Sequence, residues 1–407
     1  MTTLPISADG QAIALACSSL ALMGDRSIKP LTPTEWHGLS LSMQERKLRP
    51  RDLLGLGAGE AREALEISDQ AAKRLSDLLS RGGQLALEVE RLSNRGIWIV
   101  TRADEAYPPL LKRRLHRTAP PLLFGAGPRG GLQLPGIAIV GSRDVDDDGL
   151  SFATALARRC AEQSFAVISG AARGVDLTAM GAAVVSGGHA VGITVDPLEK
   201  LVGRGELRTA IADELLTLAT PFHPAARWHA GNAMRRNRLI YTLAQAAVVV
   251  ASSAEKGGTR AGALENLKAR WVPLHVRDDS SAGNQRLIAD GGVAIPGDEL
   301  PSEIDLESLT VDRQHSLLET DNPAPPSPTE PAPQPIEDAF VPIWPLLAQL
   351  LQRPVGEREV AESLHLELTQ ARAWLKRAVA EGHAETRPRP KRYLLRGAAQ
   401  QLPIDDS

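Results

Sequence analysis

Short apolar runs alternate with helix-length segments through the middle of this 407-residue chain. The runs are GIAIV (136–140), FAVIS (165–169), HAVGITV (189–195), AAVVVA (246–251) and WVPLHV (271–276). They are rich in β-branched residues, and each is separated from the next by enough chain for a helix. Parallel strands need such crossovers, so the pattern predicts an α/β fold whose parallel sheet has helices on both faces.

The flanking segments predict further parts. Residues 1–95 carry leucines and alanines at three- and four-residue spacing, which predicts a helical domain before a sheet domain over 96–311. Prolines and glycines crowd 101–131, so no long regular element is expected there. The proline-rich stretch 312–338 is expected to be a linker. Residues 339–398 then resemble three helices and a two-stranded wing, the pattern of a winged helix-turn-helix domain.

Overall composition excludes several classes of protein. The formal net charge is −3, so bulk charge gives no evidence for nucleic acid. Cys17 and Cys160 lie far apart in no metal-like spacing, which suits a reducing cytoplasm and argues against disulfides or zinc. No signal peptide is expected, and the apolar run 239–251 is too short to cross a bilayer. We therefore expect a cytoplasmic protein without a metal, a cofactor or membrane contact.

Loops of small residues follow three of the expected strands. Glycine lets backbone amides approach a ligand, and a helix N-terminus adds partial positive charge, so such loops favour phosphate. The residues assigned to this role are Gly141, Ser142, Arg143, Ser169, Gly170, Arg173, Gly174, Lys256, Gly257, Gly258 and Thr259. One such loop would indicate little, because tight turns need glycine anyway. Three loops at one sheet edge predict a phosphate-binding crevice, although neither a Walker lysine motif nor G-x-G-x-x-G is present.

A basic cluster precedes the run AAVVVA. It consists of Arg235, Arg236, Asn237 and Arg238, and residues 231–271 hold seven basic and two acidic side chains. Arginine pairs well with phosphate oxygens, and a groove lined this way can follow a nucleic-acid backbone. The alternative is a solvated helix start with intrahelical ion pairs. Together with the glycine loops, the cluster favours a polyanion.

Acidic residues stand close to these loops, and no residue is assigned a catalytic role. Aspartates at 144 and 146–148 would repel phosphate unless they cap the helix expected near Gly149, and capping is our expectation. Asp176 is expected to be structural and His189 to be packed in the core. No serine lies in a G-x-S-x-G context, so the chain gives no strong sign of an enzyme.

The expected winged helix is basic on both its third helix and its wing. Residues 371–396 hold eight basic and two acidic side chains. The candidates for contact with a phosphate backbone are Arg372, Lys376, Arg377, Arg387, Arg389, Lys391 and Arg392. Contact with duplex DNA would need charge in both places. A protein-binding module is an equal alternative, because the fold serves both uses.

Taken in order, the motifs resemble those of the DprA (Smf) DNA-processing family. The matching residues are Gly141-Ser142-Arg143, the run 169–176 and Arg236-Asn237-Arg238, with Tyr107-Pro108 and 119–124 upstream. The resemblance covers about Trp98 to Arg277.

The resemblance implies an extended Rossmann-like sheet, a SAM-like helical domain before it and a winged helix after it. It also implies homodimers and a basic pocket that binds single-stranded DNA without catalysis. The implied role is loading of the RecA recombinase onto incoming DNA during natural transformation. Arg143, Arg235, Arg236 and Arg238 would then hold phosphates.

The chain also departs from the family pattern, which indicates a divergent branch. Met180 stands where the family usually has histidine, and 195–229 lacks the usual family sequence. Members of such branches resemble components of phage-defence or toxin-antitoxin systems, so an operon-encoded partner is an alternative. A second alternative is a LOG-like nucleotide hydrolase, suggested by Gly257-Gly258-Thr259. The intervening glycine of that motif is absent, however, and Glu265 lies six residues after Thr259.

Overall fold

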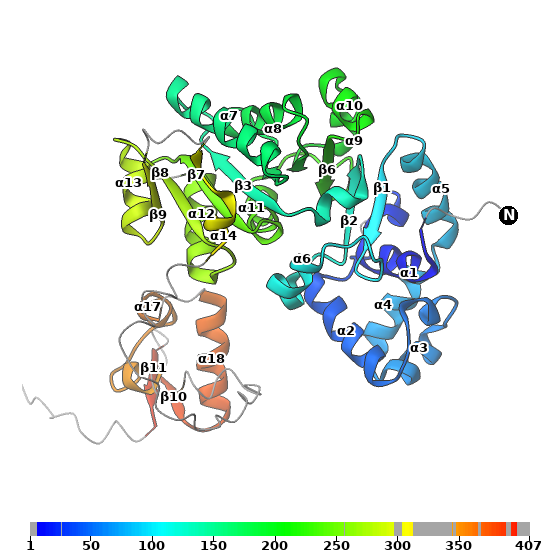
Figure 1. Cartoon of the computed structure of the whole chain (residues 1–407). Coiled ribbons are helices and arrows are strands. Elements are labelled where there is room, and N and C mark those ends of the chain that lie inside the picture. Colours follow the sequence, from blue (N-terminus) through cyan, green and yellow to red (C-terminus); the bar gives the residue numbers. More distant parts are fainter. Residues whose placement is uncertain are drawn as a thin grey trace, which may run out of the picture. The chain divides into compact units, whose positions relative to one another are not determined.

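The computed structural model describes residues 6–25, 27–255, 257–296, 303–311, 344, 347–364, 368–387 and 392–396 (Figure 1). Contacts divide the chain into two units, Met1–Asp321 and Asn322–Ser407. The linker predicted for 312–338 lies outside the described residues. Within the described part of the chain, no helix combines the length and apolar composition that crossing a bilayer requires.

The first unit begins with helices, as the leucine and alanine spacing predicts. They are α1 (Ala8–Cys17), α2 (Pro33–Glu45), α3 (Ala58–Leu65), α4 (Asp69–Leu79) and α5 (Gly82–Ser93), with 3-10 turns at Leu20–Leu22 and Pro50–Leu53. Side-chain caps set the starts of several of them. Thr32 and Glu35 form a reciprocal capping box on α2, and the Ser68 hydroxyl accepts the Ala71 N–H on α4.

A nine-stranded sheet follows, in the order β1-β2-β6-β5-β4-β3-β7-β8-β9. Its strands are β1 (Trp98–Thr101), β2 (Leu122–Ala126), β3 (Gly136–Gly141), β4 (Ala166–Ser169), β5 (Ala190–Ile193), β6 (Leu216–Thr220), β7 (Ala246–Ala251), β8 (Leu274–Asp278) and β9 (Val293–Pro296). The strands from β6 to β9 in this order are parallel, whereas β2 pairs antiparallel with both β1 and β6. The sequence pattern missed β1, β2, β6 and β9.

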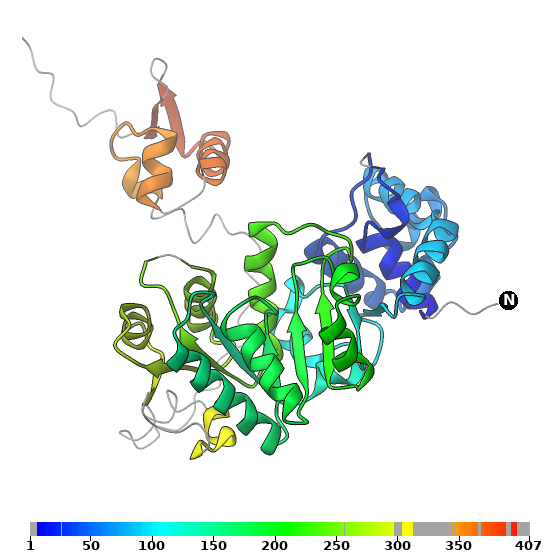
Figure 2. The same cartoon turned by 90° about the horizontal axis from the view of Figure 1, so that it is seen from above.

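Helices cover both faces of this sheet, as predicted (Figure 2). They are α6 (Pro109–Leu115), α7 (Asp147–Glu162), α8 (Val175–Val185), α9 (Leu198–Leu201), α10 (Gly205–Ala212), α11 (Ala230–Leu243), α12 (Gly258–Ala269), α13 (Ala282–Ala289) and α14 (Leu306–Thr310). Along β3, Ile137 and Ile139 belong to the core of α7 and α8. Ala138 and Val140 belong to the other core, with α11, α12 and α13. Burial on both faces explains why the strand sequences are continuously apolar.

The order of the central strands defines where a ligand site can form. Taken from β3, the run β5-β4-β3-β7-β8-β9 has the 3-2-1-4-5-6 order of a Rossmann-like sheet. The chain leaves β3 for β4 on one side and later places β7 on the other side. The helices after β3 and β7 consequently lie on opposite faces, and a crevice opens between the loops that precede them. The predicted Rossmann-like fold class is therefore confirmed.

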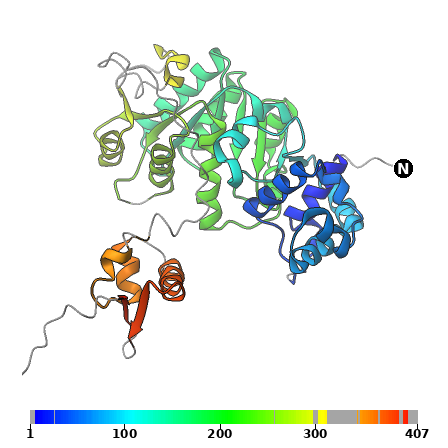
Figure 3. The ribbon, with the colours of Figure 1, turned by 90° about the horizontal axis from the view of Figure 1, so that it is seen from below.

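The second unit is small and has its own core. Residues 347–350 are helical, and α17 (Glu357–Ser363) and α18 (Leu368–Ala380) follow (Figure 3). A hairpin of β10 (Ala384–Arg387) and β11 (Arg392–Leu395) comes next, and Val355 bridges to Tyr393. The winged-helix assignment, like the domain boundaries at 95 and 311, remains a prediction.

Deleting a side chain from the α7 face should test the core assignment. Leu156 on α7 is fully buried. Leu156→Ala is expected to lower the free energy of unfolding by about 2–5 kcal/mol, because a cavity remains. Leu177→Ala on α8, where the side chain is exposed, should change it by about 0.5 kcal/mol or less. Urea unfolding measures both, and equal losses would contradict this packing.

Candidate nucleic-acid interface

A recess of about 570 Å³ lies at the carboxyl ends of β3, β4 and β7, with α11 forming one wall. It occupies the crevice that the strand order defines. Many predicted site residues meet there, although they are far apart in sequence. Those lining the recess are Gly141, Ser142, Arg143, Arg236, Asn237, Gly257, Gly258 and Thr259.

Two glycines in these loops allow close packing against neighbouring segments. The Ser142 N–H donates to the Ala251 carbonyl oxygen over 2.9 Å, and the Thr259 hydroxyl donates to that of Gly141 over 3.0 Å. Gly174 has φ +80°, and a Cβ there would lie 2.5 Å from the Ser142 carbonyl oxygen. A Cβ on Gly141 would overlap Val175. Close packing therefore accounts for Gly141 and Gly174, whereas a Cβ on Gly257 or Gly258 would meet only ordinary contacts.

The most buried charge at the recess is Arg236, which is 6% exposed. Its Nη1 lies 3.8 Å from Oδ2 of Asp176, which is equally buried at the start of α8. The Ala172 N–H donates to the same carboxylate oxygen over 3.4 Å. A Cβ on Gly170 would overlap the Arg236 guanidinium, so glycine there makes room for this pair.

Burial shifts the pKa values of both Asp176 and Arg236. Burial raises the pKa of the Asp176 carboxyl, and the Arg236 guanidinium opposes part of that rise. Burial lowers the pKa of Arg236, an effect that Asp176 opposes and the nearby charge of Arg143 reinforces. An arginine nevertheless stays protonated, so the recess floor carries a cation whose charge Asp176 only partly balances.

The arginines of the predicted cluster point in different directions because they lie on the helix α11. Successive residues of α11 point about 100° apart, so Arg235, Arg236 and Arg238 cannot share one direction. The exposed Arg235 guanidinium lies 5.6 Å from the Phe222 ring centre. Arg238 Nε lies 2.6 Å from Glu265 Oε1. Only Arg236 and Asn237 line the recess, so the expectation that all three arginines hold one phosphate chain is corrected.

Other assigned residues lie beside or beneath the recess. Ser169 is fully buried and donates its hydroxyl to the Ile139 carbonyl oxygen over 2.7 Å. Gly170 is also buried, so the expectation that these two offer backbone to a ligand is corrected. Arg173 is exposed and, with Gly174, does not line the recess. Lys256 lies outside the described residues.

One aspartate of the acidic run after Arg143 caps α7, as expected, and Asp147 and Asp148 lie in the first turn of this helix. Asp146 is the N-cap, and its side chain accepts the Gly149 N–H over 2.7 Å. The same carboxylate lies 3.7 Å from Nη1 of Arg277. Asp144 lines the recess, so one carboxylate of this run remains there.

Two aromatic residues at the recess were missed by sequence reasoning. Trp228 lies just before α11 with 52% of its surface exposed, so its ring is available to stack with a base. Tyr241 is buried in α11, and no described residue forms a hydrogen bond with its hydroxyl. Burial raises the pKa of Tyr241, so this hydroxyl remains a donor. The signal available in the sequence was a tryptophan, Trp228, a few residues before the arginine cluster.

Three features of the recess attract anions, against the carboxylates of Asp144 and Asp176 that also line it. Arg236 lies in its floor and the exposed Arg143 lines it. The helix α12 also begins there, with Gly257 as its N-cap, and its first N–H groups carry partial positive charge. The arrangement offers charge, backbone donors and an aromatic face for binding.

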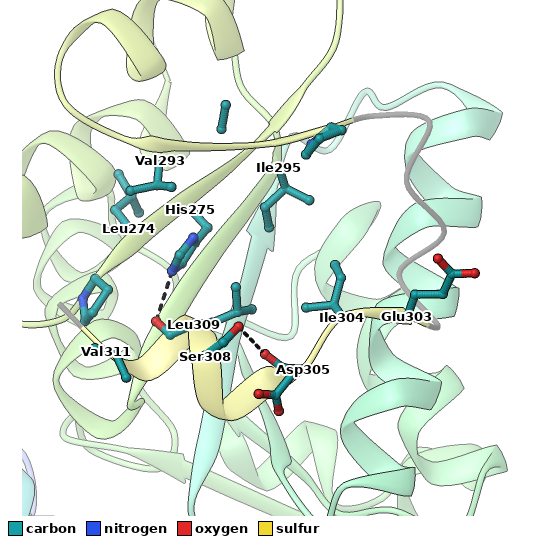
Figure 4. Close-up of a pocket in the computed structure, with 13 residues that line it drawn as sticks. Leu274, His275, Val293, Ile295, Glu303, Ile304, Asp305, Ser308, Leu309 and Val311 are labelled. Atoms are coloured by element: carbon teal, nitrogen blue, oxygen red, sulfur yellow. Dashed lines mark hydrogen bonds between the residues drawn. The ribbon is translucent and has the colours of Figure 1, made fainter. Parts of the chain in front are cut away.

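A second cavity, of about 290 Å³, lies on β8 and β9 beside α14 (Figure 4). Apolar side chains such as Val293 and Ile295 line much of it, and Glu303 and Asp305 add negative charge. His275 Nε2 lies 2.9 Å from the Leu309 carbonyl oxygen. No lysine or arginine lines this cavity among the described residues, so a polyanion has no partner there.

Carboxylates lie beside three of the arginines that the sequence assigned to DNA contact in the second unit. Arg372 Nε lies 2.8 Å from Glu357, Arg377 Nε 2.6 Å from Glu381 and Arg392 Nη1 3.1 Å from Glu359. Lys376 is exposed on α18. The side chain of Arg387, and Arg389 and Lys391 altogether, lie outside the described residues. The basic surface expected from sequence is thus partly neutralised.

The fold and the recess define a Rossmann-like α/β protein with an anion-favouring crevice between its two half-sheets. Residues 98–300 match the family described as DNA recombination-mediator protein A, and the chain belongs to this family. A putative DNA processing protein DprA of Mycobacterium tuberculosis (strain CDC 1551 / Oshkosh) is 30% identical over 220 residues. That match covers 50% of this chain and 56% of the relative, so the chain spans about half the length of the curated relatives it matches.

Two solved structures resemble the chain more distantly. DNA processing protein A from Streptococcus pneumoniae matches with a TM-score of 0.48 and 20% identity, over 68% of this chain and 99% of its own. DNA processing protein A from Helicobacter pylori, solved to study its single-stranded DNA binding mode, matches with a TM-score of 0.42 and 20% identity. That match covers 55% of this chain and 95% of its own. Both are too distant to add to the family assignment.

Removing the buried cation should make stability depend on pH. Arg236→Met leaves Asp176 without its positive neighbour, so the carboxyl pKa should rise further. A carboxyl with a raised folded pKa contributes stability at low pH that is lost as pH rises through that pKa. The variant should therefore be closest to wild type near about pH 4 and fall progressively behind toward about pH 7.

Thermal unfolding across this pH range measures the effect. Arg238→Met is the matched control, because its partner Glu265 is partly exposed and such pairs contribute about 1 kcal/mol or less. A pH-independent difference between Arg236→Met and wild type would contradict a raised Asp176 pKa.

Proposed function

We propose that this chain binds single-stranded DNA without cutting it, and that the recess holds phosphate groups of the strand. The observation that carries the proposal is the convergence of Arg143, Arg236 and the N-terminus of α12 on one recess. Arginines and helix N-termini are typical partners of phosphate oxygens. Membership of the DNA recombination-mediator family supports DNA as the source of those phosphates.

A single strand fits the recess better than a duplex. Trp228 offers an exposed ring at the recess, and stacking on an aromatic side chain requires an unpaired base. Arg235 lies one helical position before Arg236 with its guanidinium exposed over Phe222. We assign it to a phosphate farther along the strand, outside the recess.

The absence of catalysis in this proposal follows from the chemistry of the recess. The nucleotide-hydrolase alternative depended on Glu265, which pairs with Arg238 and does not line the recess. Asp176 does line it, but this carboxylate is paired with Arg236. A binding role needs neither Glu265 nor Asp176 as a free carboxylate.

The finer role follows the family resemblance. We propose that the chain acts as a homodimer and delivers bound strands to the RecA recombinase, as in natural transformation. An operon-encoded partner in a defence system has no structural observation in its favour.

We also propose that the second unit is a winged helix that contacts protein. The pairs Arg372–Glu357 and Arg392–Glu359 support this choice, because arginines held by carboxylates are less available to DNA phosphates.

The recess can be tested by removing the exposed arginine. Arg143→Ala is expected to weaken binding to oligo-dT about tenfold, since one charge-assisted phosphate contact is lost. The slope of log affinity against log salt should become less negative by about 0.7. Arg158→Ala removes the same charge from an exposed position of α7 outside the recess and should leave both unchanged. Fluorescence anisotropy measures both variants, and equal behaviour would refute the proposed groove.

Deleting residues 340–407 separates the two units. Oligo-dT affinity should survive the deletion, because the recess lies wholly in the first unit. Capture of RecA or another protein partner should be lost. Retention of partner capture together with loss of oligo-dT binding would show that the two roles are assigned to the wrong units.

A further inference from the structure

Two buried polar atoms on residues that line the recess have no hydrogen-bond partner in the described part of the chain. They are Nε of Arg236 and the hydroxyl of Tyr241, on side chains that are 6% and 2% exposed. Both are donors. A buried donor without an acceptor costs free energy, which an entering acceptor recovers.

The surroundings of these atoms favour a negatively charged acceptor. Asp176 balances the Arg236 charge only partly, at 3.8 Å, while Arg143 adds a second positive charge and Asp144 a further negative one. Gly258 and Thr259 bring the start of α12 to the same recess. Asn237 donates its amide to the Gly258 carbonyl oxygen over 3.0 Å and so fixes this helix start against α11.

The donors distinguish between the parts of a nucleotide that could enter the recess. An internal phosphate of a strand continues into sugar on both sides, so only two of its oxygens are unsubstituted and it carries one negative charge. The base of an internal nucleotide can enter, but base edges present donors beside acceptors. A terminal phosphomonoester ends in three unsubstituted oxygens and carries nearly two negative charges at neutral pH. It therefore matches a floor of donors and positive charge.

We propose that the recess takes a terminal phosphomonoester, supplied either by the end of a DNA strand or by a free nucleoside monophosphate. The volume of about 570 Å³ suits one nucleotide. In its strand-bound form the inference depends on the proposed single-stranded DNA binding. Arg236 and Tyr241 donate hydrogen bonds to the phosphate oxygens. Arg143 adds a positive charge beside the phosphate, and the Trp228 ring stacks with the base.

The test compares oligo-dT carrying a 5′-phosphate, a 3′-phosphate or neither, by anisotropy with an internal label. One phosphorylated end should bind about tenfold more tightly than the unphosphorylated strand. Tyr241→Phe should abolish that difference. This variant should fold, because the hydroxyl it removes forms no hydrogen bond within the described residues. Tyr107→Phe is the control, since its hydroxyl donates to the Pro120 carbonyl oxygen away from the recess.

Competition by thymidine monophosphate against thymidine distinguishes the two sources. The recess would be assigned to free nucleotides if only the monophosphate displaces the strand, if Tyr241→Phe loses this displacement, and if the strand ends bind equally. A strand-end preference lost in the same variant would assign it to DNA ends. Equal affinities in both experiments, or a preference that Tyr241→Phe leaves intact, would overturn the inference. Failure of every oligo-dT to bind would instead overturn the proposed function, and monophosphate binding would still report on the recess.

Discussion

The buried pair of Arg236 and Asp176 is the interaction on which the rest of the site depends. A buried cation is tolerated only beside a compensating charge, and removing one partner of such a pair is strongly destabilising. The pair in turn requires glycine at position 170, because any side chain there would occupy the space of the guanidinium. It joins α11 on one face of the sheet to α8 on the other, at the point where the strand order reverses. The recess is built around this junction.

Because Arg236 is held in the buried pair, the arginines near the recess have different roles. Arg236 is held in the floor, where solvent screens its charge least. Arg143 remains exposed and can meet a strand arriving from solution. Arg238 is occupied by Glu265, which excludes it from the same contact. In space, the arginine cluster of the sequence therefore becomes a buried cation (Arg236), an exposed cation over the Phe222 ring (Arg235) and an ion pair with Glu265 (Arg238).

The sequence anticipated the sheet better than the site. The run AAVVVA coincides with β7 because strands buried on both faces leave an unbroken apolar signal. β2 and β6 were missed, since five-residue strands among prolines, or within a segment taken as a helix, give little periodicity. At the site, the structure places Arg143 and Arg236, which the motifs named, at one recess. The directions of neighbouring α11 side chains and the burial of Ser169 depend on tertiary packing, which sequence spacing does not contain. Tyr241 was assigned no role from the sequence, because a hydrophobic pattern does not show whether a tyrosine hydroxyl has a hydrogen-bond partner.

The central claim is that the recess between the loops after β3 and β7 grips the phosphates of a DNA strand. The most direct measurement is a crystal structure of the full chain with oligo-dT. The account predicts strand phosphate against Arg143 and the start of α12, with a base beside Trp228. A strand bound at the β9 edge or on the second unit, with the recess free of nucleic acid, would contradict it.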